Sequence, residues 1–188
     1  KELVILGSLS LAGISVITTL FLILWPFSNR MNMRFKLMNR CFIACGANIP
    51  GPFGEPKDTL GVVFNELPKY NLRILKKSRL YSSIAFPDPK KPSYLNGCLE
   101  LQVHCKSSTV LDCLKSIERK MGRGKGERWG SRICDLDLLA FSNEIHPSTN
   151  VFNQWYKKPL RVQMTEKPSE LLLPHPRLQD RAFVRSES

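Results

Sequence analysis

Residues 128–139 read RWGSRICDLDLL, and this run combines a strand with a set of charged groups. The stretch from Ile133 to Phe141 is apolar except for Asp135 and Asp137. Side chains of a strand alternate between its two faces, so these two aspartates project together while their neighbours point the other way. The pattern predicts a strand with one buried face and one face that carries a carboxylate pair.

This carboxylate pair has two interpretations. A bare D-x-D is more often two solvent-facing acids on an edge strand. Adjacent carboxylates repel each other unless a cation lies between them, however, and oxygen ligands suit Mg²⁺, which commonly binds one or two carboxylates and substrate phosphates. Arg128 and Arg132 directly precede the strand, and guanidinium groups match phosphate oxygens. This context favours a metal-dependent phosphoryl-transfer site.

The surroundings of the run are basic and rich in glycine. Lys and Arg outnumber Asp and Glu 28 to 16, a net charge of +12. Such a surplus suits nucleic acid, a membrane surface or nucleotide phosphates, and net charge does not choose among them. Gly122, Gly124 and Gly126 form a loop that can close over a nucleotide, although its order and spacing are not those of a Walker A motif.

Working outward, hydrophobic periodicity predicts alternating strands and helices. Residues 143–169 look irregular and are interpreted as an insertion. We expect strands at 41–45, 72–83, 94–105, 133–141 and 171–173, a helix from Asp58-Thr59 to Pro68, and a helix from Ser108 or Thr109 to Met121. This β-α-β-β-α-β order predicts an α+β sandwich in which helices pack on an antiparallel-rich sheet.

The amino-terminal part differs from the rest. Residues 3–27 contain no charged residue, and a bilayer span needs about 20 apolar residues. Basic residues follow this segment, so the positive-inside rule would leave the remainder cytoplasmic. Alternatively, translation begins at Met31, Met33 or Met38 and the segment lies outside the working protein. We therefore expect a division into 1–38, a candidate anchor or extension with a basic linker, and 39–188, the catalytic domain.

The six cysteines contain no C-x-x-C pair and no zinc spacing, and most lie among apolar residues. We interpret them as reduced thiols in the core of a cytoplasmic protein.

Taken together, the motifs resemble the 6-hydroxymethyl-7,8-dihydropterin pyrophosphokinase family of folate biosynthesis. The resemblance covers roughly Cys41 to Val184. Besides RWGSRICDLDLL it rests on CGANIP, LYSS, KPSYLNG, IERKMGRGKGERWG and LLLPHPRLQDRAFV, in this order. It implies a ferredoxin-like α/β sandwich and the transfer of pyrophosphate from ATP to the hydroxymethyl group of the dihydropterin, with release of AMP. It also implies that residues 143–169 are longer than usual, on the adenine side of the ATP pocket, and that the carboxy-terminal end is short.

The resemblance also implies a role for individual residues. Asp135 and Asp137 correspond to the ligands of two Mg²⁺ ions, and Arg123 and Arg132 to catalytic arginines that reach the phosphates. The ATP-binding positions are Glu118, Arg128, Trp129, His175 and Arg181. The pterin-binding positions are Tyr94 and Phe183, which enclose the ring, together with Asn96, Ser83 and Asn48.

Three hypotheses follow. The first is an active pyrophosphokinase that binds ATP and the dihydropterin, binds no nucleic acid, is monomeric, and meets a membrane only if residues 3–27 belong to it. The second is a truncated, weakly active or inactive remnant of that enzyme. The third is a basic, membrane-tethered nucleic-acid binder, whose affinity would fall steeply with salt. The aromatic residues do not interleave with the basic loop as a base-stacking surface requires.

Overall fold

The structure is a computed structural model that describes residues 38–86, 88–124 and 130–178. Its elements in chain order are strand β1 (Asn39–Ala47), helix α2 (Pro56–Glu66), the 3-10 helix η1 (Leu67–Tyr70), strands β2 (Arg73–Lys77), β3 (Tyr81–Ser83) and β4 (Tyr94–Val103), helix α3 (Ser107–Lys120), strand β5 (Asp135–Phe141), and helices α4 (Thr149–Lys157) and α5 (Leu160–Thr165).

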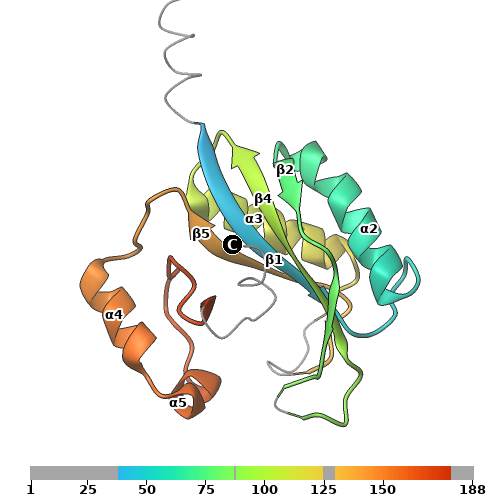
Figure 1. The fold of residues 1–188 in the computed structure, drawn as a ribbon. Coiled ribbons are helices and arrows are strands. Elements are labelled where there is room, and N and C mark those ends of the chain that lie inside the picture. Colours follow the sequence, from blue (N-terminus) through green and yellow to red (C-terminus); the bar gives the residue numbers. More distant parts are fainter. Residues whose placement is uncertain (1–37, 87, 125–129, 179–188) are drawn as a thin grey trace, which may run out of the picture. The chain divides into compact units, whose positions relative to one another are not determined.

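The strands form one antiparallel sheet in the order β2-β4-β1-β5, and β3 also pairs with β4. Figure 1 shows α2 and α3 together on one side of this sheet and α4 and α5 beside its β5 edge, away from α2. The predicted α+β class, with an antiparallel sheet and flanking helices, is therefore confirmed.

The central strand β1 separates a buried face from a face that carries small residues. Cys41, Ile43 and Cys45 are almost fully buried and belong to the core cluster, where apolar residues of α2 and α3 cover them. The alternate positions include Ala44 and Gly46. Because a strand alternates its faces, these two small residues leave the sheet shallow on the side that the helices do not cover.

Most predicted boundaries shift by one or two residues, and two of the differences have a clear cause in hydrogen bonding. Residues 72–83 form two strands rather than one, since Ser78 interrupts the ladder by accepting a hydrogen bond from the Cys98 amide with its hydroxyl (2.9 Å). The first helix begins at Pro56 rather than at Asp58. Asp58 instead occupies the third helical position, where its carboxylate accepts a hydrogen bond from the Glu55 amide (3.1 Å).

The segment expected to be irregular contains α4 and α5, so that expectation was wrong. The Ser148 hydroxyl caps α4 by accepting from the Val151 amide (3.3 Å). An isolated bridge between His146 and Leu173 ties the chain together on either side of the two helices. Of the strand predicted at 171–173, the structure shows only this bridge. Helices this short are stable only through such tertiary anchoring.

The apolar residues 3–27 lie outside the described part of the chain, and the predicted division at residue 38 stays a prediction. Among the helices that the structure does describe, none combines the length and the apolar character that crossing a bilayer requires.

Candidate active site

The two aspartates project from β5 on the face that the helices leave open. Leu136 and Leu138 are 4% and 3% exposed and belong to the core cluster, while both aspartates are partly exposed. The alternation predicted from the sequence is therefore confirmed. Across the sheet, Asp135 is in register with Gly46 and Asp137 with Ala44, so no large side chain of β1 covers the carboxylates.

Asp135 lies between two arginines. One oxygen of its carboxylate, Oδ1, is 3.0 Å from Nη1 of Arg123 and 3.0 Å from Nη1 of Arg132. All three side chains are partly exposed, at 27%, 29% and 19% respectively. Arg123 follows α3 and Arg132 precedes β5, so arginines from the two ends of the loop that connects α3 with β5 meet at one carboxylate. The arrangement holds two positive charges where an anionic ligand can reach them.

Glu118 lies behind this group, near the end of α3. Its side chain is only 8% exposed, and its Oε1 accepts a hydrogen bond from the Leu136 amide (2.7 Å) and from Nη1 of Arg123. The Arg123 amide also donates to the Glu118 carbonyl (3.0 Å). Glu118 thus joins α3, β5 and the start of the glycine loop. The structure places it beneath Arg123, and its predicted contact with ATP stays a prediction.

A second group lies on β3 and β4. The amide nitrogen of Asn96 donates to the Ser83 hydroxyl (2.8 Å), and Tyr94 pairs with Ser83 in the ladder. The Tyr94 hydroxyl donates to the Gly130 carbonyl (3.1 Å). Burial, and then the nearby Asp135 carboxylate, raise the pKa of Tyr94. Three of the predicted pterin-binding residues therefore lie together, close to the aspartate pair.

Gly46 separates the two groups. It is in register with Asn96 on one side and with Asp135 on the other. Neighbouring strands are about 4.8 Å apart, so the backbones of Asn96 and Asp135 are about 10 Å apart, on either side of Gly46. A Cβ on Gly46 would lie 2.8 Å from Oδ1 of Asn96. Because residue 46 has no side chain, the Asn96 amide can lie beside it and donate to Ser83.

Asn48 is buried directly after β1. Its Oδ1 accepts from the Arg132 amide (2.6 Å), and its Nδ2 donates to the Pro92 carbonyl (3.0 Å) and to the Ser131 hydroxyl (3.3 Å). These bonds join three loops around the open face. A contact between Asn48 and the pterin, predicted from the sequence, stays a prediction, since the structure gives this amide protein partners on both of its polar atoms.

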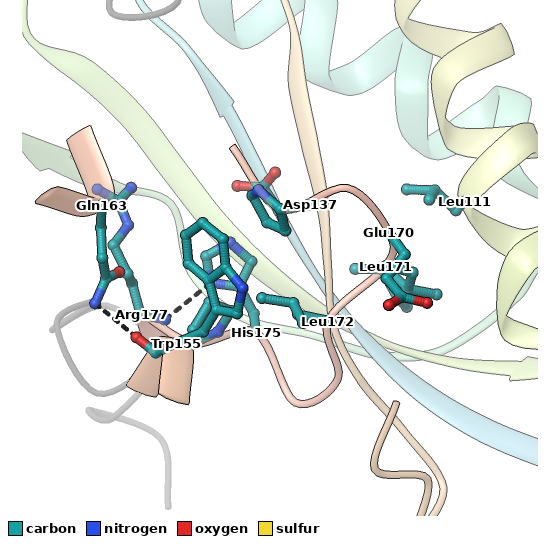
Figure 2. A pocket seen from close by; sticks show the side chains of 12 residues that line it. Leu111, Asp137, Trp155, Gln163, Glu170, Leu171, Leu172, His175 and Arg177 are labelled. Carbon is teal, nitrogen blue, oxygen red and sulfur yellow. Dashed lines mark hydrogen bonds between the residues drawn. The ribbon is translucent and has the colours of Figure 1, made fainter. Parts of the chain in front are cut away.

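His175 and Asp137 line a common cavity of about 220 Å³ beside β5. Figure 2 shows both side chains directed into it. The His175 amide donates to the Leu139 carbonyl (2.7 Å), which ties this loop to β5, and Nδ1 of the ring accepts from the Arg177 amide (3.2 Å). In the neutral imidazole the proton is therefore on Nε2. The lining of the cavity thus joins the carboxylate of Asp137 to aliphatic surface from Leu138 and Leu172.

The donor set of the aspartate pair suits magnesium. Asp135 and Asp137 offer hard oxygen ligands, two positions apart on one strand face. Within residues 38–178, apart from positions 87 and 125–129, no three His, Cys, Asp or Glu side chains are gathered to hold a metal ion. A protein that supplies two carboxylates leaves the other ligand positions to water and phosphate, which is how Mg²⁺ is usually bound.

Four predicted site residues, Arg128, Trp129, Arg181 and Phe183, lie outside the described residues. In the other direction, the sequence interpretation missed Trp155 and Gln163, which the structure places in the lining of the same cavity as Asp137 and His175. The available signal for α4 was the helical spacing of Val151, Phe152, Trp155 and Tyr156 in a segment treated as irregular.

Comparison with known proteins identifies the family. Residues 42–187 match the model of the 7,8-dihydro-6-hydroxymethylpterin-pyrophosphokinase family. The chain belongs to this family. A pyrophosphokinase family member from Pseudomonas aeruginosa, 2-amino-4-hydroxy-6-hydroxymethyldihydropteridine pyrophosphokinase, is 30% identical over 148 residues, which cover 79% of this chain and 77% of the relative.

Two further relatives of the same name agree with this assignment. The protein from Synechocystis is 32% identical over 135 residues, which are 71% of this chain and 58% of that relative. The protein from Haemophilus influenzae is 29% identical over 142 residues, which are 73% of this chain and 87% of the relative. The pyrophosphokinase resemblance read from the motifs is confirmed.

Proposed function

We propose that this chain transfers pyrophosphate from ATP to 6-hydroxymethyl-7,8-dihydropterin and releases AMP, in the biosynthesis of tetrahydrofolate. Its relatives carry the name of that enzyme. The observation that carries the proposal is the placement of Asp135 and Asp137 on one open face of the sheet. Asp135 contacts two arginines, and Asp137 lines the cavity beside β5. The groups needed for phosphoryl transfer are thus gathered on one side of the sheet.

In this reaction the pterin hydroxyl oxygen attacks the β-phosphorus of ATP. The bond from that phosphorus to the oxygen bridging the α- and β-phosphates breaks, AMP leaves with this oxygen, and the hydroxyl proton passes to solvent. No protein nucleophile is needed, so the contribution of the chain is positioning and charge stabilisation. Asp135 and Asp137 would hold two Mg²⁺ ions, which when bound neutralise the charge of the phosphates.

The ion pairs of Asp135 suggest how ATP is accepted. In the structure its carboxylate is paired with Arg123 and Arg132, each at 3.0 Å. We propose that both arginines move to the phosphate oxygens when ATP binds, while the carboxylate turns to the metal. Glu118 limits the movement of Arg123, since its carboxylate accepts a hydrogen bond from the same guanidinium group. The exchange keeps the charge of the site balanced in both states.

The β3–β4 group is proposed to bind the pterin. Asn96 and Ser83 offer an amide and a hydroxyl to the polar edge of the ring, and Tyr94 offers an aromatic face. Asn48 completes this side by fixing the loops around it. The distance of about 10 Å between the Asn96 and Asp135 backbones leaves room for a flat ring whose hydroxymethyl group points to the carboxylates.

The cavity beside β5 is proposed to bind the nucleoside part of ATP, with His175 and Asp137 at the end nearer the phosphates. Arg128, Trp129 and Arg181 are proposed to contact ATP and Phe183 to face Tyr94. These four assignments rest on the motifs RWGSRICDLDLL and LLLPHPRLQDRAFV.

The strand order and the antiparallel pairing support a ferredoxin-like classification, because β5-β1-β4-β2 corresponds to the order 4-1-3-2 of the four main strands. We also propose that the protein is a monomer and works in the cytoplasm, where its six free cysteines stay reduced. Size-exclusion chromatography with light scattering tests the monomer.

The test of the function is AMP release from ATP in the presence of Mg²⁺ and the dihydropterin. We expect AMP and pterin diphosphate to form in equal amounts, and no AMP to form when the pterin is omitted. A folded protein that produces no AMP above background under these conditions would refute the proposal and favour the remnant hypothesis.

A further inference from the structure

One wall of the nucleotide cavity comes from the segment that carries α4 and α5. Trp155, on α4, lines the cavity together with Asp137 and His175, and Figure 2 shows its indole beside the imidazole and below the carboxylate. Because this segment begins and ends at the His146–Leu173 bridge, Trp155 is brought back to β5 although it lies in a separate helix.

Lys158 and Gln163 hold the Trp155 residue in place. The Lys158 ammonium lies 3.9 Å from the centroid of the Trp155 ring, and it pairs with the Glu166 carboxylate. Gln163 is 9% exposed, and its Nε2 donates to the carbonyls of Trp155 (3.1 Å) and Lys158 (2.8 Å). A buried amide thus fastens the end of α4 to α5. The ring is fixed before any ligand arrives, which reduces the entropy lost on binding.

The rest of the cavity suits a flat, largely apolar group. Leu138 and Leu172 supply aliphatic surface and are 3% and 5% exposed. The charged groups Asp137, Glu170 and Arg177 also line the cavity. A nucleotide has this same division, with an apolar base face at one end and charged phosphates at the other.

We propose that Trp155 is a nucleotide-binding residue of this chain, on whose indole the base of ATP stacks. This inference rests on the proposed function, since it names the residue that grips the base of its co-substrate. A stack of base on aromatic side chain is worth about 1–3 kcal/mol by alanine substitution, or about five- to hundredfold in affinity. The Lys158 ammonium lies 3.9 Å from the centroid of the indole, and Lys158 is not one of the residues that line the cavity.

The test compares Trp155→Ala with Trp155→Phe and with the control Tyr156→Ala. Tyr156 is the next residue of α4 and is 47% exposed, so its removal probes damage to the helix alone. We expect Trp155→Ala to raise the KM for ATP by about five- to hundredfold. The KM for the pterin and the kcat at saturating ATP should stay within about twofold of the wild type. Trp155→Phe should restore most of the affinity, and Tyr156→Ala should leave every constant unchanged.

Calorimetric titration with two probes separates base stacking from a structural role. α,β-Methylene-ATP has both base and phosphates and cannot react, whereas inorganic tripolyphosphate has no base. Trp155→Ala should weaken the analogue and leave tripolyphosphate unaffected. Equal weakening of both probes, or an unchanged affinity for the analogue, would overturn the inference. Because neither probe turns over, this result is independent of AMP release, and an inactive wild type would count against the proposed function instead.

Discussion

Replacing Asn48 by alanine should destabilise the protein strongly, although the change removes only a short polar side chain. Asn48 is 3% exposed and accounts for hydrogen bonds at 2.6 Å to the Arg132 amide, 3.0 Å to the Pro92 carbonyl and 3.3 Å to the Ser131 hydroxyl. The bond between the Asn48 amide and the Arg132 carbonyl (3.0 Å) is made by the main chain and stays in every variant.

The magnitude follows from the groups that are left behind. Each of the two shorter bonds is worth about 1 kcal/mol, and a buried partner that finds no replacement costs about 1–3 kcal/mol. Asn48→Ala therefore should lower the free energy of unfolding by about 2–4 kcal/mol, since water can reach part of the site. For a domain of this size that corresponds to a fall in Tm of about 5–15 °C.

Asn48→Asp should cost about half as much. Its carboxylate still accepts from the Arg132 amide, and the Ser131 hydroxyl, which accepts from Asn48 in the wild type, can turn to donate to it, but the carboxylate faces the Pro92 carbonyl without a proton to donate. Asn65, exposed on α2, provides the matched control, and Asn65→Ala should change stability by less than about 0.5 kcal/mol. Urea unfolding followed by circular dichroism measures all three variants. An Asn48→Ala protein as stable as Asn65→Ala would refute the idea that this amide joins the loops.

Three other changes test the site. Asp137→Ala should lower turnover by about a hundredfold or more while leaving the unfolding midpoint within about 2 °C, because the carboxylate is proposed to hold the metal and lies on the face of β5 away from the core; near-normal AMP release would contradict its assignment. Gly46→Ala should raise the pterin KM by about fivefold or more and spare the ATP KM, since its Cβ at 2.8 Å displaces Asn96 from Ser83. Burial raises the pKa of the Cys45 thiol to about 12, whereas an unfolded thiol ionises near 8.5. The contribution of this thiol to the free energy of unfolding should therefore be complete below about pH 8.5 and fall as the pH rises towards 12. The slope is at most about 1.4 kcal/mol per pH unit. Urea midpoints of wild type and Cys45→Ala between pH 8 and 11 measure this, and identical slopes would exclude a role for the thiol.

The part of the site that the sequence predicted correctly is the part that local patterns determine. The face of β5 that carries Asp135 and Asp137 follows from strand periodicity, because Leu136 and Leu138 can be buried only if the aspartates face the other way. The order of strands and helices likewise follows from apolar spacing. Each of these predictions needs only residues that are neighbours in the chain.

The interactions that the sequence did not reveal join distant residues. Asn48 and Arg132 are separated by 84 positions, and Glu118 and Leu136 by 18. Asparagine and glutamate are compatible with a surface loop and an exposed helix face, and only the packing of α3 against β5 buries the glutamate. Helices α4 and α5 were missed for a related reason, since short helices gain their stability from tertiary contacts such as the Gln163 bonds rather than from propensity.

The position of the site follows from the small residues of β1. An antiparallel sheet with helices on one face needs large apolar residues only on that face, which Cys41, Ile43 and Cys45 provide. On the other face, Gly46 lies in register between Asn96 and Asp135, so the sites proposed for the pterin and for the metal-bound phosphates adjoin over a residue that has no side chain. A side chain at position 46 would point away from the core cluster, yet it would displace Asn96 from Ser83 and lie between the two proposed substrate sites. Both function and the Asn96–Ser83 hydrogen bond therefore favour glycine here, and the separate effects of Gly46→Ala on the pterin KM and on the unfolding midpoint distinguish these two constraints.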